Sequence, residues 1–307
     1  MAKTRDIQRR IKSINSTKKI TKAMEMVSAA KMRKAVEAVL KTRAYANLSW
    51  GTILNLSLAA ASNEEIHPAF QQRKEIKRVG VIVISSNRGL CGGFNSAIVA
   101  KVHRSILKHN HGLPHEFILL GKKGVSLYRH FKYNIVAEFP KPDVTEQITQ
   151  VLPVAKMTMD NFKSGYYDKV LIAFTDFKDA ARQIPRMRQI LPININDPYD
   201  LGEAELASAK KNGENGNNAP AGMEYIFEPS PREVLDQMVP RLIEIQIYQA
   251  LLESNASEHS ARMGAMHQAN QAAGDLVNEL TLSFNKERQA SITSEIAEIS
   301  AGANALK

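Results

Sequence analysis

The sequence predicts an α/β domain inserted between two long terminal α-helices that form an antiparallel coiled coil. Three observations lead to this fold class. Residues 234–306 carry an apolar seam at alternating three- and four-residue steps, and residues 3–60 contain no proline and a single glycine. Between these segments, short apolar runs alternate with helical stretches, a pattern that is typical of an α/β domain with a mainly parallel sheet.

The first predicted element is a coiled-coil helix over residues 1–60. Its apolar stripe has helical spacing but slips between Ile14 and Ile20 and again between Val27 and Met32. Such slips indicate a long helix that winds around another helix without a strict heptad. The predicted stripe consists of Ile7, Ile11, Ile14, Ile20, Met24, Val27, Met32, Val36, Val39 and Leu40, continued by Tyr45, Trp50, Ile53, Leu54 and Leu58.

Residues 76–200 are predicted to form the α/β domain with a mainly parallel sheet. Apolar runs bounded by turn residues predict strands, and amphipathic stretches between them predict helices. The expected strands are 79–84, 117–120, 135–139 and 170–174, and the expected helices are 94–107, 122–131 and 144–163. Residues 181–192 and 225–227 are each expected to add one edge strand. Pro185 and Pro192 indicate that the first of these strands lies at an edge of the sheet, because proline cannot donate a ladder hydrogen bond.

Residues 201–222 are rich in Gly, Asn and Ala and poor in large apolar residues, which predicts a mobile loop. Residues 223–307 are then expected to hold the second edge strand and the C-terminal coiled-coil helix. Pro240 implies that this helix either kinks there or starts near Arg241. The predicted seam is Leu235, Met238, Leu242, Ile245, Gln249, Leu252, Ala256, His259, Met263, Met266, Asn270, Ala273, Val277, Leu280, Phe284 and Glu287.

Charge is distributed unevenly along the chain. Residues 1–45 carry 13 Lys or Arg against 3 Asp or Glu, whereas residues 230–307 carry 6 against 10. The two terminal helices therefore attract each other, and a shaft made from them favours an acidic surround. The sequence shows no membrane-spanning run and no signal or transit peptide at Met1. The single cysteine, Cys91, excludes an intrachain disulfide and a Cys-based zinc site.

A glycine turn follows the first predicted strand, as in phosphate-binding α/β domains. Its Gly89, Gly92 and Gly93 have the spacing GxxGG, which differs from the dinucleotide pattern GxGxxG, and the chain contains no GxxxxGK[ST] motif. Neither a Ser/His/Asp ordering nor a paired-carboxylate cluster stands out. The sequence therefore predicts no catalytic site, no cofactor and no metal.

Three motifs carry a family resemblance. They are ITKAMEMVSAAKMRK at residues 20–34, RGLCGG at 88–93 after the first strand, and NKERQASIT at 285–293 near the end. In this order the motifs resemble those of the γ subunits of rotary F-type ATP synthases, and the resemblance covers the chain except residues 201–222.

The resemblance implies a non-catalytic central rotor shaft. Its expected partners are the hexameric ring of α and β subunits, the ε subunit and the membrane c-ring, and it would couple proton-driven rotation to ATP synthesis or hydrolysis on β. The chain lacks the cysteine pair of redox-regulated chloroplast forms and a mitochondrial presequence. The expected location is therefore the cytoplasmic face of a bacterial inner membrane, as a peripheral protein without membrane insertion.

The resemblance also assigns partner contacts to individual residues. Arg88, with Cys91 beside it, is implied to meet an acidic loop of β, and Lys31, Arg33 and Lys34 are further candidates for such loops. Arg288, Gln289 and Thr293 correspond to the catch contact at the top of the shaft. Tyr225 and Glu228 correspond to the foot segment against the membrane ring.

Two other classes of protein remain open from the residues alone. The first is a basic coiled-coil protein that binds nucleic acid through its first helix, although a single Trp offers few stacking platforms. The second is a nucleotide-binding enzyme built on the α/β domain. Salt-dependent DNA binding would favour the first, and stoichiometric nucleotide binding the second.

Overall fold

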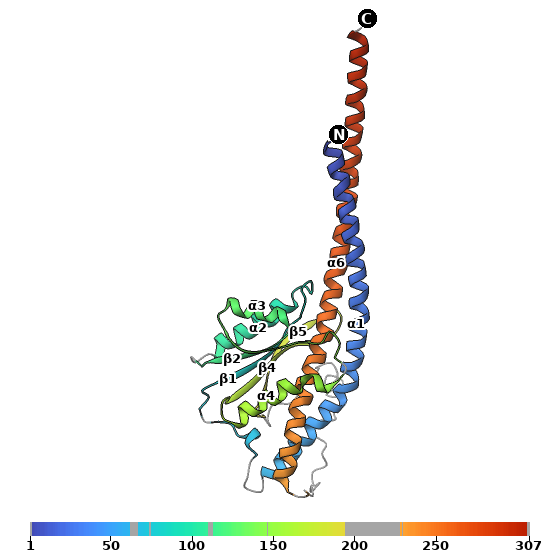
Figure 1. The fold of residues 1–307 in the computed structure, drawn as a ribbon. Helices are drawn as coiled ribbons and strands as arrows, with labels where there is room; N and C mark the ends of the chain where they lie inside the picture. The colour runs from blue at the N-terminus through green and yellow to red at the C-terminus, as the bar shows by residue number, and fades with distance from the viewer. Residues whose placement is uncertain are drawn as a thin grey trace. The chain divides into compact units, whose positions relative to one another are not determined.

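A computed structural model describes residues 2–61, 67–73, 75–109, 113–145, 147–193, 228 and 230–305. The chain divides into two compact units, one made of Met1–Ser28 and Arg262–Lys307 and the other of Ala29–Ala261. Two long helices, α1 (Ala2–Ala61) and α6 (Pro231–Ala305), contribute to both units (Figure 1). The predicted fold class, an α/β domain between two long terminal helices, is confirmed.

The second unit contains a five-stranded sheet with the order β3-β2-β1-β4-β5. Its first four strands are parallel, and β5 pairs antiparallel with β4 at one edge. The strands are β1 (Val79–Ile84), β2 (His115–Leu120), β3 (Asn134–Phe139), β4 (Lys169–Phe177) and β5 (Gln183–Leu191). The mainly parallel sheet and the edge position of the proline-containing strand are as predicted, whereas residues 225–227 lie outside the described residues.

Helices cover both faces of this sheet (Figure 1). Val81 and Val83 of β1 pack on the side of α2 (Phe94–His109) and α3 (Lys122–His130). The alternate residues Ile82 and Ile84 join the core formed with α4 (Leu152–Lys163) and α6. Burial on both faces explains why β1 is apolar at every position.

The helix predicted over residues 144–163 begins later than expected. A short 3₁₀ helix, η2 (Ile148–Val151), leads into α4, which has a proline in its first turn where the missing N–H needs no partner. Residues 140–145 and 147 belong to an irregular connection between β3 and η2, which we call the β3–η2 loop and which contacts α6. Tertiary contacts therefore override the helical pattern at its start. The first 3₁₀ helix, η1 (Pro68–Phe70), lies between α1 and β1.

Helix α6 starts at Pro231 and continues through Pro240. The alternative that the helix starts near Arg241 is therefore wrong. Val239 and Leu242, on either side of the proline, are buried in the core of the second unit, and this packing offsets the lost backbone hydrogen bond. Every predicted seam position of α6 from Leu235 to Glu287 is buried or partly buried, so the heptad interpretation of this helix is confirmed.

The stripe predicted for α1 is partly wrong. Ile20, Val27 and Leu40 are each more than half exposed, and Tyr45 is also exposed. The positions that continue the heptad from Ile14 to Met32 are polar, namely Lys18, Thr21, Glu25 and Ser28, and Met24 of the predicted stripe is partly buried beside them. The heptad therefore does not slip; it continues through polar residues, and the apolar residues that suggested a slip lie on the outer surface. The side chains of Trp50 and of residues 51–61 lie outside the described ones.

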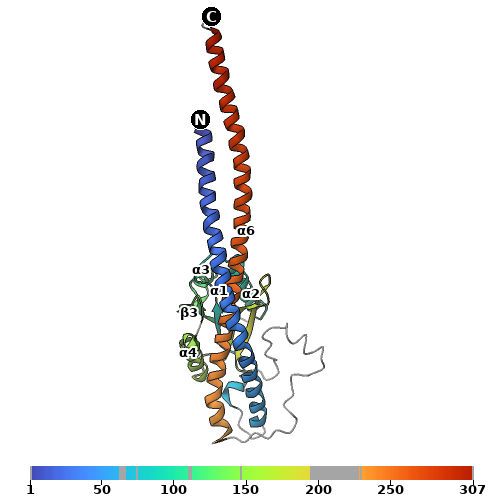
Figure 2. The same ribbon diagram turned by 90° about the vertical axis from the view of Figure 1, so that its right-hand side faces the viewer.

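The two helices run antiparallel within each unit (Figure 2). In the second unit, Thr42 of α1 donates to Gln249 of α6 over 2.7 Å. In the first unit, Glu25 of α1 lies 3.2 Å from the Nδ1 atom of His267 on α6. Among the described residues, we find no helix with an apolar stretch long enough to span a membrane.

Candidate functional site

Residues 249–260 of α6, which we call the polar segment, make polar contacts with α1, β4 and the β3–η2 loop in the second unit. Every residue of this segment is buried although most of its side chains are polar. A buried polar group costs free energy unless it finds a hydrogen-bond partner, so the segment depends on groups from other elements. Its buried polar residues are Gln249, Glu253, Ser254, Asn255, Ser257, Glu258, His259 and Ser260.

Glu253 connects three elements through one carboxylate. Its Oε1 atom accepts a hydrogen bond from Arg43 of α1 at 2.8 Å and another from Gln249 at 3.2 Å. Its Oε2 atom accepts from the backbone N–H of Phe177, the last residue of β4, at 3.1 Å. Burial raises the pKa of the Glu253 carboxyl, and the Arg43 guanidinium opposes that rise. Helix α1, helix α6 and the sheet therefore meet at this side chain.

Two serines of the polar segment complete the backbone hydrogen bonding of β4. The pairing of β1 with β4 ends at Val83 and Ala173, so Thr175 has no partner on β1. Instead, the Thr175 N–H donates to the Ser254 hydroxyl at 3.1 Å, and the Thr175 carbonyl accepts from the Ser257 hydroxyl at 3.1 Å. Because hydrogen bonds are directional, this pair fixes both the rotation and the axial position of α6 against the strand.

The β3–η2 loop holds the polar segment from another direction. Lys141 forms a buried ion pair with Glu258. The Asn255 side-chain amide donates to the Thr145 hydroxyl at 2.7 Å. Removing one partner of such a buried pair leaves an uncompensated charge, so this arrangement disfavours separation of the loop from α6.

Asp143, in the same loop, contacts both helices. Its carboxylate accepts from Lys31 of α1 at 2.9 Å, and its carbonyl accepts from the Nε2–H of His259 on α6 at 2.8 Å. The hydrogen bond from Lys31 is the main cause that lowers the pKa of the Asp143 carboxyl, and the positive charges of Arg88 and His259 lower it further. Of the predicted partner contacts, Lys31 therefore binds this carboxylate directly, and the positive charge of Arg88 also acts on it.

The polar segment lies where an open α/β sheet usually binds its ligand. Such ligands sit outside the carboxyl ends of the strands, at the point where the strand order reverses. Here the order reverses between β1 and β4, and Ser254 and Ser257 bind the end of β4 at that point. In the glycine turn, the Ser86 N–H already donates to the Asn95 side chain at 3.0 Å. Within the described residues, no group of three His, Cys, Asp or Glu side chains could hold a metal ion.

The glycine turn presents Arg88 and not the cysteine beside it. Arg88 and Leu90 are exposed, and Leu90 has a positive φ of 61°. Cys91 is 2% exposed, and its sulfur accepts a hydrogen bond from the Asn95 amide at 3.3 Å. The thiol therefore packs inside the turn and helps to set its shape. Arg88 therefore stays a predicted contact residue, whereas Cys91, predicted beside it, is buried.

The other predicted contact residues divide between the two units. Arg33 and Lys34 are exposed on α1 in the second unit, and Glu228 is exposed before α6. In the first unit Arg288, Gln289 and Thr293 are all exposed on α6. Gln289 and Thr293 are four residues apart, so they project from one side of the helix. Tyr225 lies outside the described residues.

Arg288 also lines a groove between the two helices of the first unit, together with Arg5 of α1 and Phe284 of α6. Beyond this groove α6 makes few contacts. Ser291 is the last partly buried position, and every residue from 292 to 301 is exposed. Arg288 and Gln289 therefore lie beside the last partly buried positions of α6, and Thr293 lies in the fully exposed stretch that follows.

Sequence reasoning missed the polar segment. The run Glu253-Ser-Asn-Ala-Ser-Glu-His-Ser260 was visible, and Gln249 and His259 were recognised as polar seam positions. A run of that kind usually marks a solvated helix face. Its burial became evident only when β4 and the β3–η2 loop were placed beside it. One signal could have indicated this burial: in residues 249–260, polar residues occupy seam positions as well as positions between them over successive helical turns.

Comparison with known proteins identifies relatives along the whole chain. A family model described as ATP synthase matches residues 3–306. An ATP synthase gamma chain from Heliobacterium modesticaldum is 41% identical, covering 98% of this chain and 98% of its own length. Another from Herpetosiphon aurantiacus is also 41% identical over 100% of this chain and 99% of its own, and one from Legionella pneumophila is 38% identical over the full length of both.

Solved structures share the fold. A chain in the cryo-EM structure of the Euglena gracilis mitochondrial ATP synthase (OSCP/F1/c-ring, rotational state 3) matches with a TM-score of 0.66 and 17% identity, covering 99% of this chain and 95% of that chain. A chain from the central stalk/c-ring structure of the Tetrahymena thermophila enzyme matches with a TM-score of 0.59 and 24% identity, covering 81% and 99%. At these identities the structures support the fold alone.

Proposed function

The chain belongs to the family of ATP synthase gamma chains, and from this premise we propose that its polar segment holds the α/β domain and the two helices together while torque passes through them. As a gamma chain it is a central-stalk subunit and not itself the catalytic one. We propose that its specific role is coupling. The chain would transmit the proton-driven rotation of the membrane ring to the β subunits, which catalyse ATP synthesis or hydrolysis.

One observation carries this proposal. The carboxylate of Glu253 is hydrogen-bonded at once to α1, to α6 and to the end of β4. An apolar seam resists separation of two helices but is non-directional, so it resists sliding and rotation only weakly. Buried hydrogen bonds between fixed groups break when the elements rotate against each other. The polar segment is therefore suited to a subunit whose α/β domain and two helices must rotate as one rigid body.

The proposed partners are the α and β subunits of the hexameric ring, the ε subunit and the membrane c-ring. The resemblance to F-type γ subunits and the full-length bacterial relatives support this assignment. We place the chain at the cytoplasmic face of a bacterial inner membrane, as a peripheral protein. Family membership decides against the two alternatives, a nucleic-acid-binding coiled coil and a nucleotide-binding enzyme.

The proposed contacts with α and β involve two surfaces. Exposed Arg88, Arg33 and Lys34 offer positive charge to an acidic loop, and Lys31 supports Arg88 through its contact with Asp143. At the other surface, Arg288, Gln289 and Thr293 offer polar groups on an otherwise accessible helix. Glu228, together with Tyr225, is proposed to face the membrane ring.

Coupling in the assembled complex tests the proposal. In the variant Ser254→Ala/Ser257→Ala, we expect ATP hydrolysis to continue, whereas proton-driven ATP synthesis falls because the domain is no longer fixed to α6. The matched control is Ser294→Ala, which removes an exposed serine of the same helix. Equal ATP synthesis in the double variant and in the control, at equal subunit stoichiometry, would contradict the role of the polar segment.

A further inference from the structure

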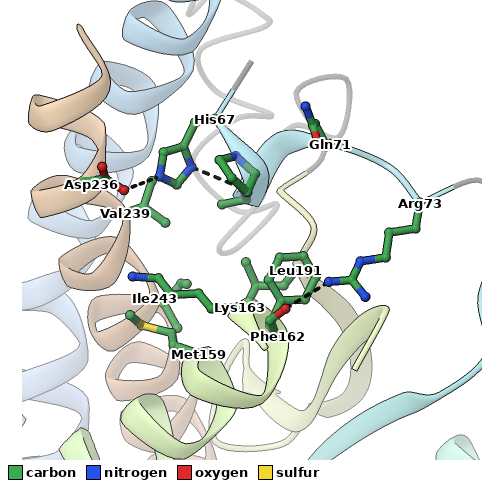
Figure 3. Close-up of a pocket in the computed structure, with 12 residues that line it drawn as sticks. His67, Gln71, Arg73, Met159, Phe162, Lys163, Leu191, Asp236, Val239 and Ile243 are labelled. Atoms are coloured by element: carbon green, nitrogen blue, oxygen red, sulfur yellow. Dashed lines mark hydrogen bonds and ion pairs between the residues drawn. The ribbon is translucent and has the colours of Figure 1, made fainter. Parts of the chain in front are cut away.

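A cavity of about 310 Å³ lies in the second unit (Figure 3). Its α6 residues, Asp236, Val239 and Ile243, precede the polar segment in the sequence. Its volume is at the lower end of the range for small-molecule sites. The apolar part of its wall comes from three elements: Phe162 at the end of α4, Leu191 at the end of β5, and Val239 and Ile243 on α6. All four of these side chains are buried, so the apolar wall belongs to the core.

The histidine in this cavity is not available as a base. The Nδ1 atom of His67 accepts a hydrogen bond from the Ala69 N–H at 3.2 Å. Since Nδ1 is the acceptor, the neutral ring carries its hydrogen on Nε2, which donates to the Oδ1 atom of Asp236 at 3.1 Å. Both ring nitrogens are therefore used. The second oxygen of Asp236, Oδ2, stays available, and its side chain is 52% exposed.

Two opposite charges at the cavity do not neutralise each other. Among the described residues, Lys163 has no hydrogen-bond or ion-pair partner, and the partner of Asp236 is His67. In Figure 3 the Lys163 side chain extends from α4 toward α6, the helix that carries Asp236. Arg73, by contrast, is already bound to Asp168 at 2.6 Å and to the Phe162 carbonyl at 2.9 Å.

We propose that this cavity binds an apolar α-amino acid in its zwitterionic form. The ligand ammonium would pair with Asp236, its carboxylate with Lys163, and its side chain would cover Phe162, Leu191 and Ile243. A simple anion would pair with Lys163 and leave Asp236 without a counter-charge, and a simple cation would pair with Asp236 and leave Lys163 without one. A small molecule that carries both charges beside an apolar group satisfies each wall at once.

Binding to the full-length chain tests the proposal, with L-leucine and L-phenylalanine as probes followed by NMR titration. Leucinamide lacks the carboxylate and N-acetyl-leucine lacks the ammonium, so these two molecules separate the contributions of the charges. We expect saturable binding of the amino acids, about tenfold tighter than binding of either derivative, because each derivative loses one charge-assisted contact.

Two variants connect each charge to its residue. Asp236→Asn keeps an acceptor for His67 and should abolish the preference for leucine over N-acetyl-leucine. Lys163→Gln should abolish the preference for leucine over leucinamide. Lys156→Gln, on the exposed side of the same helix α4, is the control that should change neither. Absence of saturable binding, equal affinity for all probes, or equal effects of Lys163→Gln and Lys156→Gln would overturn the proposal.

Discussion

Helix α6 is held in two different ways along its length. In the second unit, every residue from 251 to 260 is buried, and polar side chains connect it to α1, to β4 and to the β3–η2 loop. In the first unit, residues 263–287 are covered mainly along the seam, and the positions between the seam residues are mostly exposed. The hydrogen bonds of the second unit are directional, whereas the seam of the first unit depends on the packing of side chains.

This difference shows that one regular helix is held by two kinds of interaction. A seam of partly buried side chains needs only one partner helix, and its interactions change gradually when the helices shift. The polar segment needs three partners in fixed positions, and each of its hydrogen bonds is lost when one partner moves. We therefore expect substitutions in the polar segment to have large effects and substitutions near the tip to have small ones.

The largest expected effect is that of Arg43→Ala. Glu253 is fully buried, so loss of the guanidinium leaves a carboxylate without its main counter-charge. Breaking a buried ion pair from one side costs about 3–5 kcal/mol. Urea unfolding of the full-length chain, followed by circular dichroism, measures the change in the free energy of unfolding.

The second substitution Glu253→Gln is the control for this prediction. In the Arg43→Ala background it removes the unpaired charge, so part of the lost stability should return. The neutral amide can still accept a hydrogen bond from the Phe177 N–H. If Arg43→Ala lowers the free energy of unfolding by no more than an exposed substitution does, the contact of Glu253 with α1, α6 and β4 does not hold α1 in place.

An intermediate effect is expected for Ser254→Ala/Ser257→Ala. The variant leaves the N–H and the carbonyl of Thr175 buried without their partners. Each unsatisfied buried group costs about 1–3 kcal/mol. Hydrogen exchange at the Thr175 amide should become faster, and the free energy of unfolding should fall. An unchanged exchange rate would mean that water or another group replaces the serines.

A smaller effect is expected from the ion pair of Lys31 and Asp143. Both side chains are about one third exposed, and such pairs contribute less than about 1 kcal/mol. The pKa of Asp143 is lowered in the folded state. Its stabilising contribution is therefore present above the unfolded pKa, about 3.9, and is lost as the pH falls through the lower folded value.

Lys31→Met tests the cause of that lowered pKa. It removes the hydrogen bond that contributes most, so the pKa of Asp143 should rise toward its ordinary value in an NMR titration of the carboxyl group. Lys34→Met, which changes an exposed lysine of the same helix, should leave it unchanged. Equal pKa values in the two variants would exclude Lys31 as the main cause.

The smallest effect is expected near the tip. Ser294 is exposed, and its hydroxyl donates to Glu298 one turn further along α6 at 3.2 Å. Exposed substitutions of this kind usually change stability by no more than about 0.5 kcal/mol. Thermal unfolding of Ser294→Ala should therefore match that of the unchanged chain. A loss as large as that of the serine pair in the polar segment would remove the contrast between the two regions.

Sequence patterns predicted the elements that depend on local periodicity. The seam of α6 was predictable because its apolar residues keep one heptad, and β1 because its apolar run ends at a glycine turn. The stripe of α1 was misassigned because Lys18 and Thr21 face inward while Ile20 faces outward. The contacts of Asp143 could not be predicted, since they join residues more than a hundred positions apart.

Rotation under load tests the central claim most directly. A bead attached through Lys101→Cys, an exposed position on α2, reports the motion of the α/β domain in the assembled complex. With ATP supplied under viscous load, we expect the bead to rotate steadily when the chain carries the unchanged polar segment. With Ser254→Ala/Ser257→Ala combined with Lys141→Ala, ATP hydrolysis should continue while the bead slips or stalls. Rotation of the variant with the same torque as the parent would contradict the claim that the polar segment fixes the domain to the shaft.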